Sequence, residues 1–250
     1  MNKSIMRIYT LTKRNLKEIL REPLSLVFTI GLPLFMEVLF YFIFHDMTSQ
    51  FAMKYLAPGI VVFSQAFLTL FTGMLIATDK SSSFLTHLYV SKAKSYEFIF
   101  AYAFAILPIA LIQSILFFVV GGIIDSSIFC VGMIWAVLQS IMTALFFIAL
   151  GILFGSISNE KSVGGISSIV IVGQSVLSGM WFPMDELDQS IIMLMNVLPF
   201  RNATLLIQNV LNGINNVVSD YFFPLINVIL YSVIIFILAI MFFRSKMKDN

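Results

Sequence analysis

Residues 98–123 read FIFAYAFAILPIALIQSILFFVVGGI, a stretch of 26 residues without one charged side chain. A helix that crosses the hydrocarbon of a bilayer needs about 20 mostly apolar residues. Over the whole chain of 250 residues, 59% are hydrophobic and 11% are charged, against about 25% charged in soluble domains. This composition excludes a soluble, disordered or disulfide-rich secreted protein, and it predicts an all-α polytopic membrane protein.

Six stretches are long and apolar enough to span a membrane, and we expect all of them in one membrane domain, residues 24–250. The predicted spans are residues 24–44, 57–77, 98–123, 128–154, 163–180 and 222–243. Residues 191–200 are about half the required length, so a re-entrant or interfacial helix is expected there. The asparagine-rich residues 202–220 are predicted to be a solvated turn and helix. The single cysteine, Cys130, is expected to be buried and inert.

The distribution of positive charge predicts the orientation in the membrane. With the N-terminus inside, 13 of the 15 Lys and Arg residues fall on the cytoplasmic side, and only Lys54 and Arg201 fall outside. Membrane proteins concentrate Lys and Arg in their cytoplasmic segments. Both termini are therefore predicted to be cytoplasmic.

Residues 1–23 are expected to form an amphipathic helix before the first span. An apolar stripe recurs at helical spacing from Ile5 to Leu20, with Arg7, Arg14 and Arg21 on another face. Such a helix lies in the headgroup plane until a proline, here Pro23, ends it. Two interpretations remain open: a topology anchor, or a lever that meets a cytoplasmic partner.

The cytoplasmic loop 79–97 is the second candidate for contact with that partner. Asp79 and the serines after it are expected to start a short surface helix. This helix would expose apolar residues at helical spacing, namely Phe84, Leu85, Leu88 and Tyr89.

The sequence contains no common catalytic or nucleotide-binding motif. It has no G-x-x-x-x-G-K-[ST], so ATP binding in a P-loop is excluded for this chain. His45 and His87 fall on opposite sides of the predicted membrane and cannot share a metal. The acidic residues Asp185, Glu186 and Asp188 are more typical of a solvated helix start than of a cation site. We expect no catalytic residue, metal or cofactor on this chain.

Glu37 is the one ionisable residue deep within a predicted span. A carboxylate at that depth is costly and is expected to face the protein interior or a cavity. Hydrogen bonding to Gln65 or Ser64 on the second span and a role in translocation are equally compatible with the sequence. Three further glutamines within spans are predicted to make interhelical contacts or to line a pore: Gln113, Gln139 and Gln174.

Several short motifs follow one another along the chain. Arg14-Asn15-Leu16, Arg21-Glu22-Pro23 and the later Pro33 match R-N-L…R-x-P…P. Tyr55-Leu56-Ala57-Pro58-Gly59 matches Y-L-x-P-G at the start of the second span.

The remaining motifs lie in the loops. Residues 79–88 match D-x-x-x-G-F-L-x-x-L, with Ser83 in place of the glycine. Residues 178–183, SGMWFP, followed by Leu198-Pro199, match S-G-x-x-F-P…L-P. In this order and on a six-span chain, the motifs resemble the permease subunit of type-2 ABC transporters, and most closely the daunorubicin-exporter-like branch.

The resemblance implies an export permease that works as a dimer, homo- or heteromeric, with a separate ATPase subunit that binds ATP and Mg²⁺. The amphipathic helix and the loop would then contact the ATPase through Arg14, Arg21, Phe84, Leu85, Leu88 and Tyr89. Residues 179–200 would form an outer gate that includes Gly179, Trp181, Phe182, Pro183 and Pro199. Substrate would pass between two permease chains, along a pathway that includes Glu37, Gln65 and Gln174.

The implied cargo is a hydrophobic or amphipathic small molecule, peptide or lipid, moved out of a prokaryotic cell across its plasma membrane. A polysaccharide or lipid-linked glycan is the alternative cargo. Two other classes were weighed: a membrane-embedded enzyme acting on lipid, and a non-transporting immunity or scaffold protein. The enzyme needs paired carboxylates or clustered histidines at one membrane depth, and the spans supply only Glu37.

Overall fold

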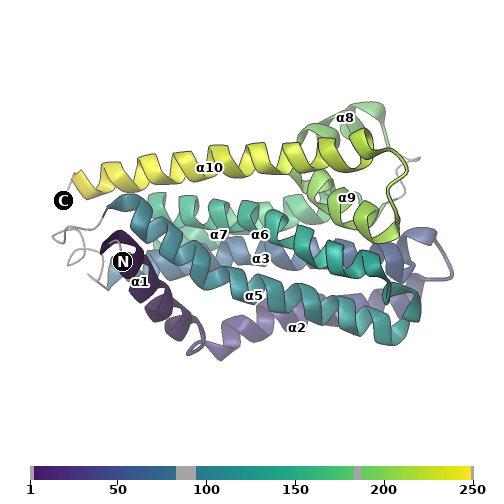
Figure 1. The fold of residues 1–250 in the computed structure, drawn as a ribbon, viewed down its shortest axis with the longest axis horizontal. Helices are drawn as coiled ribbons and strands as arrows, with labels where there is room; N and C mark the ends of the chain where they lie inside the picture. Colours follow the sequence, from purple (N-terminus) through teal and green to yellow (C-terminus); the bar gives the residue numbers. More distant parts are fainter. Residues whose placement is uncertain (1–2, 83–93, 183–186, 249–250) are drawn as a thin grey trace.

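A computed structural model describes residues 3–82, 94–182 and 187–248, and all regular structure in these ranges is helical. The helices lie roughly side by side, and both chain termini are at one end of the bundle (Figure 1), here called the termini side; the opposite end is the far side. The described α-helices are α1 Lys3–Ile19, α2 Pro23–Phe44, α3 Met53–Ser81, α5 Ser95–Ile124, α6 Val131–Ile157, α7 Glu160–Leu177, α8 Gln189–Val197, α9 Pro199–Asn212 and α10 Phe223–Lys248. Short 3₁₀ turns at Ser49–Phe51 and Ser126–Ile128 and a π-helical turn at Val217–Phe222 complete the described chain.

Within the described residues, five helices are long and apolar enough to cross a membrane: α2, α3, α5, α6, and α10 with the π-helical turn before it. Helices α8 and α9 meet the criterion only as a pair, bent by 79° at Leu198, which gives up to six spans. Helix α7, over the predicted span 163–180, is not among the five, and its 18 residues include Glu160, Lys161 and Gln174. The polytopic all-α class is confirmed.

Helix α3 lies at the centre of the bundle. In its most apolar stretch 78% of the residues are buried, against 17% in α2 and α10, which lie at opposite edges in Figure 1. Glycines allow α6 to approach α3 closely. A Cβ on Gly151 would lie 2.6 Å from the Thr69 carbonyl oxygen, and one on Gly155 would lie 2.7 Å from that of Gly73. Small residues spaced four apart are a common means of close packing between membrane helices.

Amide side chains compensate for prolines within the helices. Proline has no N–H, so the carbonyl four residues earlier loses its helical partner. For Pro33, Pro58 and Pro224, that carbonyl accepts a hydrogen bond from a side chain of another helix. The three bonds run from Gln113 Nε2 to Thr29 O (3.2 Å), from Asn212 Nδ2 to Lys54 O (3.0 Å) and from Asn209 Nδ2 to Asp220 O (2.9 Å).

The prediction of a solvated segment over 202–220 is therefore wrong for its first half. Pro199 begins α9 rather than ending the apolar stretch before it, and α9 packs against α6, α10 and α3. Asn202 is buried and donates to the carbonyl oxygens of Asn196 and Leu198. Asn202 and Asn209 bind backbone carbonyls within the protein, and Asn212 does so although it is exposed.

The α3–α6 contact yields a prediction with a matched control. Gly151→Ala should lower the free energy of unfolding of the purified chain by about 1–3 kcal/mol, because the new methyl group would lie 2.6 Å from the Thr69 carbonyl oxygen. Gly165→Ala on α7 should leave stability unchanged or raise it, because no atom lies within 4 Å of its Cβ and alanine favours the helix. Thermal unfolding in detergent compares the two variants. Equal shifts would contradict the proposed close packing.

Candidate functional site

An ion pair at the termini side joins the N-terminal helix to the central helix. Arg14 of α1 holds Asp79, in the last turn of α3, through two bonds: Nη2 to Oδ1 at 2.5 Å and Nη1 to Oδ2 at 2.6 Å. The Tyr102 hydroxyl of α5 donates to Asp79 Oδ2 at 2.5 Å. The Asp79 side chain is 1% exposed, so three helices meet at one buried carboxylate. Such two-pronged pairing fixes orientation as well as distance.

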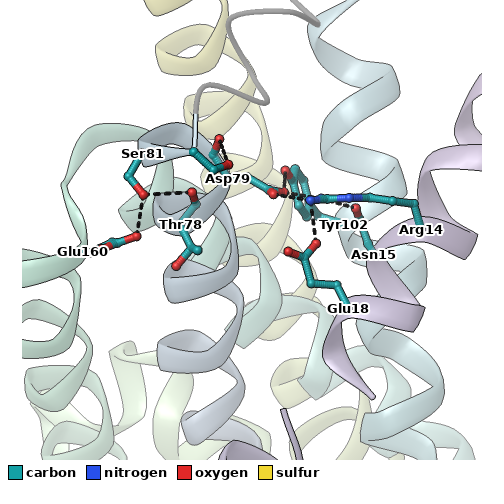
Figure 2. Close-up of polar contacts among 9 residues, drawn as sticks. Arg14, Asn15, Glu18, Thr78, Asp79, Ser81, Tyr102 and Glu160 are labelled. Carbon is teal, nitrogen blue, oxygen red and sulfur yellow. Dashed lines mark hydrogen bonds and ion pairs between the residues drawn. The ribbon is translucent and has the colours of Figure 1, made fainter. Parts of the chain in front are cut away.

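Two more residues of α1 complete this cluster, as Figure 2 shows. Arg14 also pairs with Glu18 Oε2 at 2.7 Å and donates to Asn15 Oδ1 at 3.0 Å. Burial raises the pKa of Glu18, the charge of Asp79 raises it further, and Arg14 partly offsets both. Burial alone would lower the pKa of Arg14, but the hydrogen bond and charge of Asp79 outweigh it and raise that pKa. Arg14 therefore remains a cation here.

A second link attaches the start of α1 to the start of α5. Glu97, in the first turn of α5, accepts hydrogen bonds from Ser4 Oγ and from the backbone N–H of Lys94. Arg7 lies 3.5 Å from the same carboxylate. The amphipathic helix predicted over residues 3–22 is thus present as α1, and it packs along α5. Ile5 and Leu20, from its predicted apolar stripe, are exposed.

The residue after Asp79 connects α3 to the other half of the bundle. The Lys80 ammonium donates to the carbonyl oxygens of Gly155, Ser156 and Ser158, at 3.2, 3.0 and 2.9 Å. A cation suits this position because the C-terminus of α6 carries unpaired carbonyls and the negative end of the helix dipole. The next residue, Ser81, donates to Glu160 of α7 at 2.7 Å (Figure 2).

Of the residues predicted to contact an ATPase, the structure places only Arg14 in this cluster. Arg14 lies in the cluster, whereas Arg21 lies exposed in the turn after α1. Phe84, Leu85, Leu88 and Tyr89 fall outside the described residues. The sequence predicts that Asp79 starts a surface helix. This prediction is wrong, because Asp79 belongs to the last turn of α3. The partners Glu97, Tyr102 and Glu160 were not predicted, since nothing in a single sequence pairs them with residues tens of positions away.

A cavity of about 560 Å³ adjoins the cluster. Its wall is mostly apolar and includes Phe28 of α2 and Phe67, Phe71 and Met74 of α3. Three carboxylates also line it: Glu18, Glu22 and Glu160. Pockets for drug-sized ligands measure about 300–1,000 Å³ and combine apolar walls with a few polar groups. This cavity has the size and lining of such a pocket.

Glu37 is fully buried, but a hydrogen bond to Gln65 or Ser64, one of the two alternatives left open by the sequence, is absent. Neither carboxylate oxygen has a hydrogen-bond partner among the described residues. Gly121 of α5 leaves room for the carboxylate, since a Cβ there would lie 3.2 Å from Glu37 Oε1. Ser64 instead donates to the Val61 carbonyl within its own helix.

The other predicted pathway residues make contacts between helices. Gln65 donates to the Ser140 carbonyl at 2.9 Å and accepts from the Thr143 hydroxyl at 2.6 Å, which joins α3 to α6. Gln174 of α7 donates to the Thr204 hydroxyl of α9 at 3.2 Å. Gln139 donates to the Tyr221 hydroxyl at 2.9 Å. A role of Gln65 or Gln174 in a pathway remains a prediction.

The predicted outer gate gathers aromatic rings at the far side. The ring centroid of Trp181 lies 4.8 Å from that of Phe40 on α2 and 6.3 Å from that of Phe51. Gly179 adopts a φ of 73°, which favours glycine, and the Phe182 carbonyl accepts from Gln50 at 2.6 Å. Pro183 lies outside the described residues. Pro199 begins α9 in the bent pair.

Candidate metal ligands are not grouped in the described part of the chain, where no three His, Cys, Asp or Glu side chains could hold an ion together. His45 lies 3.3 Å from Asp46 at the far side. Cys130 is exposed, contrary to expectation, with its sulfur 3.8 Å from the Leu211 carbonyl oxygen.

Comparison with known proteins identifies the family. A family model described as ABC-2 type transporter matches residues 6–212, which is most of the chain and includes α1, the charged cluster and α9. The chain therefore belongs to the ABC-2 type transporter family. A search of curated proteins finds no match.

The Arg14–Asp79 pair predicts a large coupling energy. Arg14→Gln leaves Asp79 buried without its cation and should lower the free energy of unfolding by about 3 kcal/mol. This value is at the lower end for a broken buried pair, because 32% of the Arg14 side chain is exposed. A double-mutant cycle with Asp79→Asn should give about 2 kcal/mol of interaction energy. Lys13→Gln, at an exposed neighbour with the same charge change, should stay within about 0.5 kcal/mol. Additive effects of Arg14→Gln and Asp79→Asn would contradict the pairing.

Replacement by leucine should have opposite effects on stability at Glu37 and at Gln65. Glu37→Leu removes a buried carboxyl group that has no hydrogen-bond partner, so stability should be unchanged or higher. Gln65→Leu removes both hydrogen bonds that join α3 to α6 at this point and should lower the free energy of unfolding by about 1–3 kcal/mol. Thermal unfolding of both variants in the same detergent measures the difference. A larger loss for Glu37→Leu than for Gln65→Leu would show that the carboxyl group has a structural role.

Proposed function

We propose that this ABC-2 family chain is the permease subunit of an ATP-driven exporter. Two permease chains would pair in the plasma membrane of a prokaryotic cell, with a separate ATPase subunit on the termini side, which would be cytoplasmic. ATP and Mg²⁺ would bind to that ATPase. The family match supports an ABC transporter permease, and the motif series of the daunorubicin-exporter-like branch supports export.

The observation that carries the proposal is that the charged cluster and the cavity share residues. Glu18 pairs with Arg14 and also lines the cavity, and Glu160 binds Ser81 and also lines it. A displacement of α1 would act through Arg14 on Asp79, at the end of α3. The same helix contributes Phe67, Phe71 and Met74 to the cavity wall. Displacement of α1 by an ATPase would therefore reshape the cavity.

The lining of the cavity favours a hydrophobic or amphipathic cargo. Its apolar wall suits rings or acyl chains, and the carboxylates of Glu18, Glu22 and Glu160 suit a positive charge on the cargo. A polysaccharide fits a mostly apolar wall less well, because hydroxyl groups cover most of its surface. An amphipathic cation is thus the preferred substrate class.

Exposed apolar stripes support pairing with a second permease chain. Phe28, Phe35 and Phe42 recur every seven residues on α2 and are 59%, 65% and 66% exposed. Ile169 and Val172 form a similar stripe on α7. Both helices border the cavity, through Phe28 and through Gly164. A partner chain across these stripes would enclose the cavity between two copies.

The proposal predicts that loop residues couple ATP hydrolysis to transport. The chain is purified with the ATPase that accompanies it in native membranes and is reconstituted into proteoliposomes with rhodamine 6G as an amphipathic cation. Phe84→Ser combined with Leu88→Ser should abolish ATP-dependent dye movement while membrane insertion stays normal, because the docking contact is apolar. Met47→Ser, an equally apolar to polar change at an exposed far-side residue, should leave dye movement unchanged.

Two results would contradict the proposal. One is that no ATPase accompanies the chain from native membranes. The other is that dye movement persists when the ATPase is inactivated, which would favour a non-transporting or ATP-independent role for the chain.

A further inference from the structure

Arg201 occupies an unfavourable position at the far side. It is the third residue of α9, where the helix dipole is positive and a cation is disfavoured. Its side chain is half-buried and donates to Asn196 Oδ1. Among residues 3–82, 94–182 and 187–248, no carboxylate forms an ion pair with it. Within the described residues, the guanidinium therefore has no carboxylate to balance its charge.

Arg201 lines a small polar pocket between the start of α3, the turn at Gly179 and α9. The pocket measures about 210 Å³, below the roughly 300 Å³ of the smallest drug-sized sites. Its other polar lining residues are Ser49, Gln50, Tyr55, Ser178 and Gln208. It has room for a headgroup but not for the cargo proposed above.

One hydrogen-bond acceptor beside this pocket has no partner within the described residues. Gln50 donates through Nε2 to the Phe182 carbonyl, which sets the orientation of its amide, and its Oε1 is buried without a partner. Gln208 is held in a similar way by its bond to the Tyr55 carbonyl at 2.9 Å. The pocket thus presents a cation, which calls for an anionic oxygen, and lies beside an unpaired buried acceptor, which calls for a hydroxyl donor.

We propose that this pocket binds the headgroup of an anionic phospholipid that carries free hydroxyls, of the phosphatidylglycerol type. The phosphate lies against Arg201 at the N-terminus of α9, where anions are favoured, and a glycerol hydroxyl donates to Gln50 Oε1. The site is at membrane-surface depth, since α3 begins at Met53 and the lining Tyr55 and nearby Trp181 are residue types of the membrane interface. The acyl chains stay in the bilayer. This binding does not depend on the transported cargo.

Native mass spectrometry of the full chain tests the proposal. Purified chain in nonionic detergent is titrated with phosphatidylglycerol, phosphatidic acid or phosphatidylcholine. The wild type should retain one phosphatidylglycerol, and Arg201→Gln should bind it about tenfold more weakly or worse, as expected for a lost charged hydrogen bond. Lys54→Gln, at the other far-side cation, should match the wild type. Gln50→Leu should remove the preference for phosphatidylglycerol over phosphatidic acid, which lacks the glycerol hydroxyls.

Arg201→Lys separates loss of charge from misfolding, because it keeps the cation and should restore most of the binding. Equal retention by wild type and Arg201→Gln, or equal retention of phosphatidylglycerol and phosphatidylcholine by the wild type, would overturn the proposal. Displacement of the lipid by soluble glycerol phosphate at matched concentration would also overturn it, since the pocket would then serve a soluble phosphate compound.

Discussion

Every polar group buried in this bundle must find a partner within the protein, because lipid offers none. The fold satisfies that constraint with side-chain amides. Gln113, Asn209 and Asn212 each donate to a carbonyl that a proline has deprived of its helical partner, and Gln65 joins α3 to α6. These bonds hold bent or broken helices against α3, which the glycines of α6 approach closely. The constraint is not met everywhere: among the described residues, Glu37, Gln50 Oε1 and the Oε1 atoms of Gln113 and Gln174 are among the buried polar atoms without a hydrogen-bond partner.

The charges at the termini side follow the same logic and link separate helices. Asp79 and Lys80 are adjacent, yet Asp79 binds α1 and α5 while Lys80 caps α6. The end of α3 is thereby connected to both halves of the bundle directly before the loop proposed to meet the ATPase. The cavity begins beside this junction, so a small displacement of α1 acts on its wall without a long chain of intermediate contacts. The far-side pocket at Arg201 is separate from this route and concerns the membrane surface.

Much of this architecture could be predicted from the sequence. Charge-free stretches such as residues 98–123 predict spans, because length and periodicity are local properties. Pro23 indicates the break between the two helices, although α1 already ends at Ile19 and Pro23 begins α2. The charged cluster could be found only in part. Arg14 and Asp79 are visible as motif residues, but their pairing spans 65 positions and depends on how α1 lies along α5. The asparagines of α9 were misjudged for a related reason: composition indicates polarity, but it does not show that the partner is a backbone carbonyl instead of water.

The central claim is that the Arg14–Asp79 pair transmits ATP-driven movement of α1 to the cavity. It is tested most directly by pulsed electron paramagnetic resonance on the complex with its ATPase. Spin labels are placed at Lys13 of α1 and at Gly165 of α7, in a Cys130→Ser background. We expect ATP to shift the distance distribution between the labels, and Asp79→Asn to abolish that shift. A distribution that ATP leaves unchanged, or a shift that persists in Asp79→Asn, would contradict it.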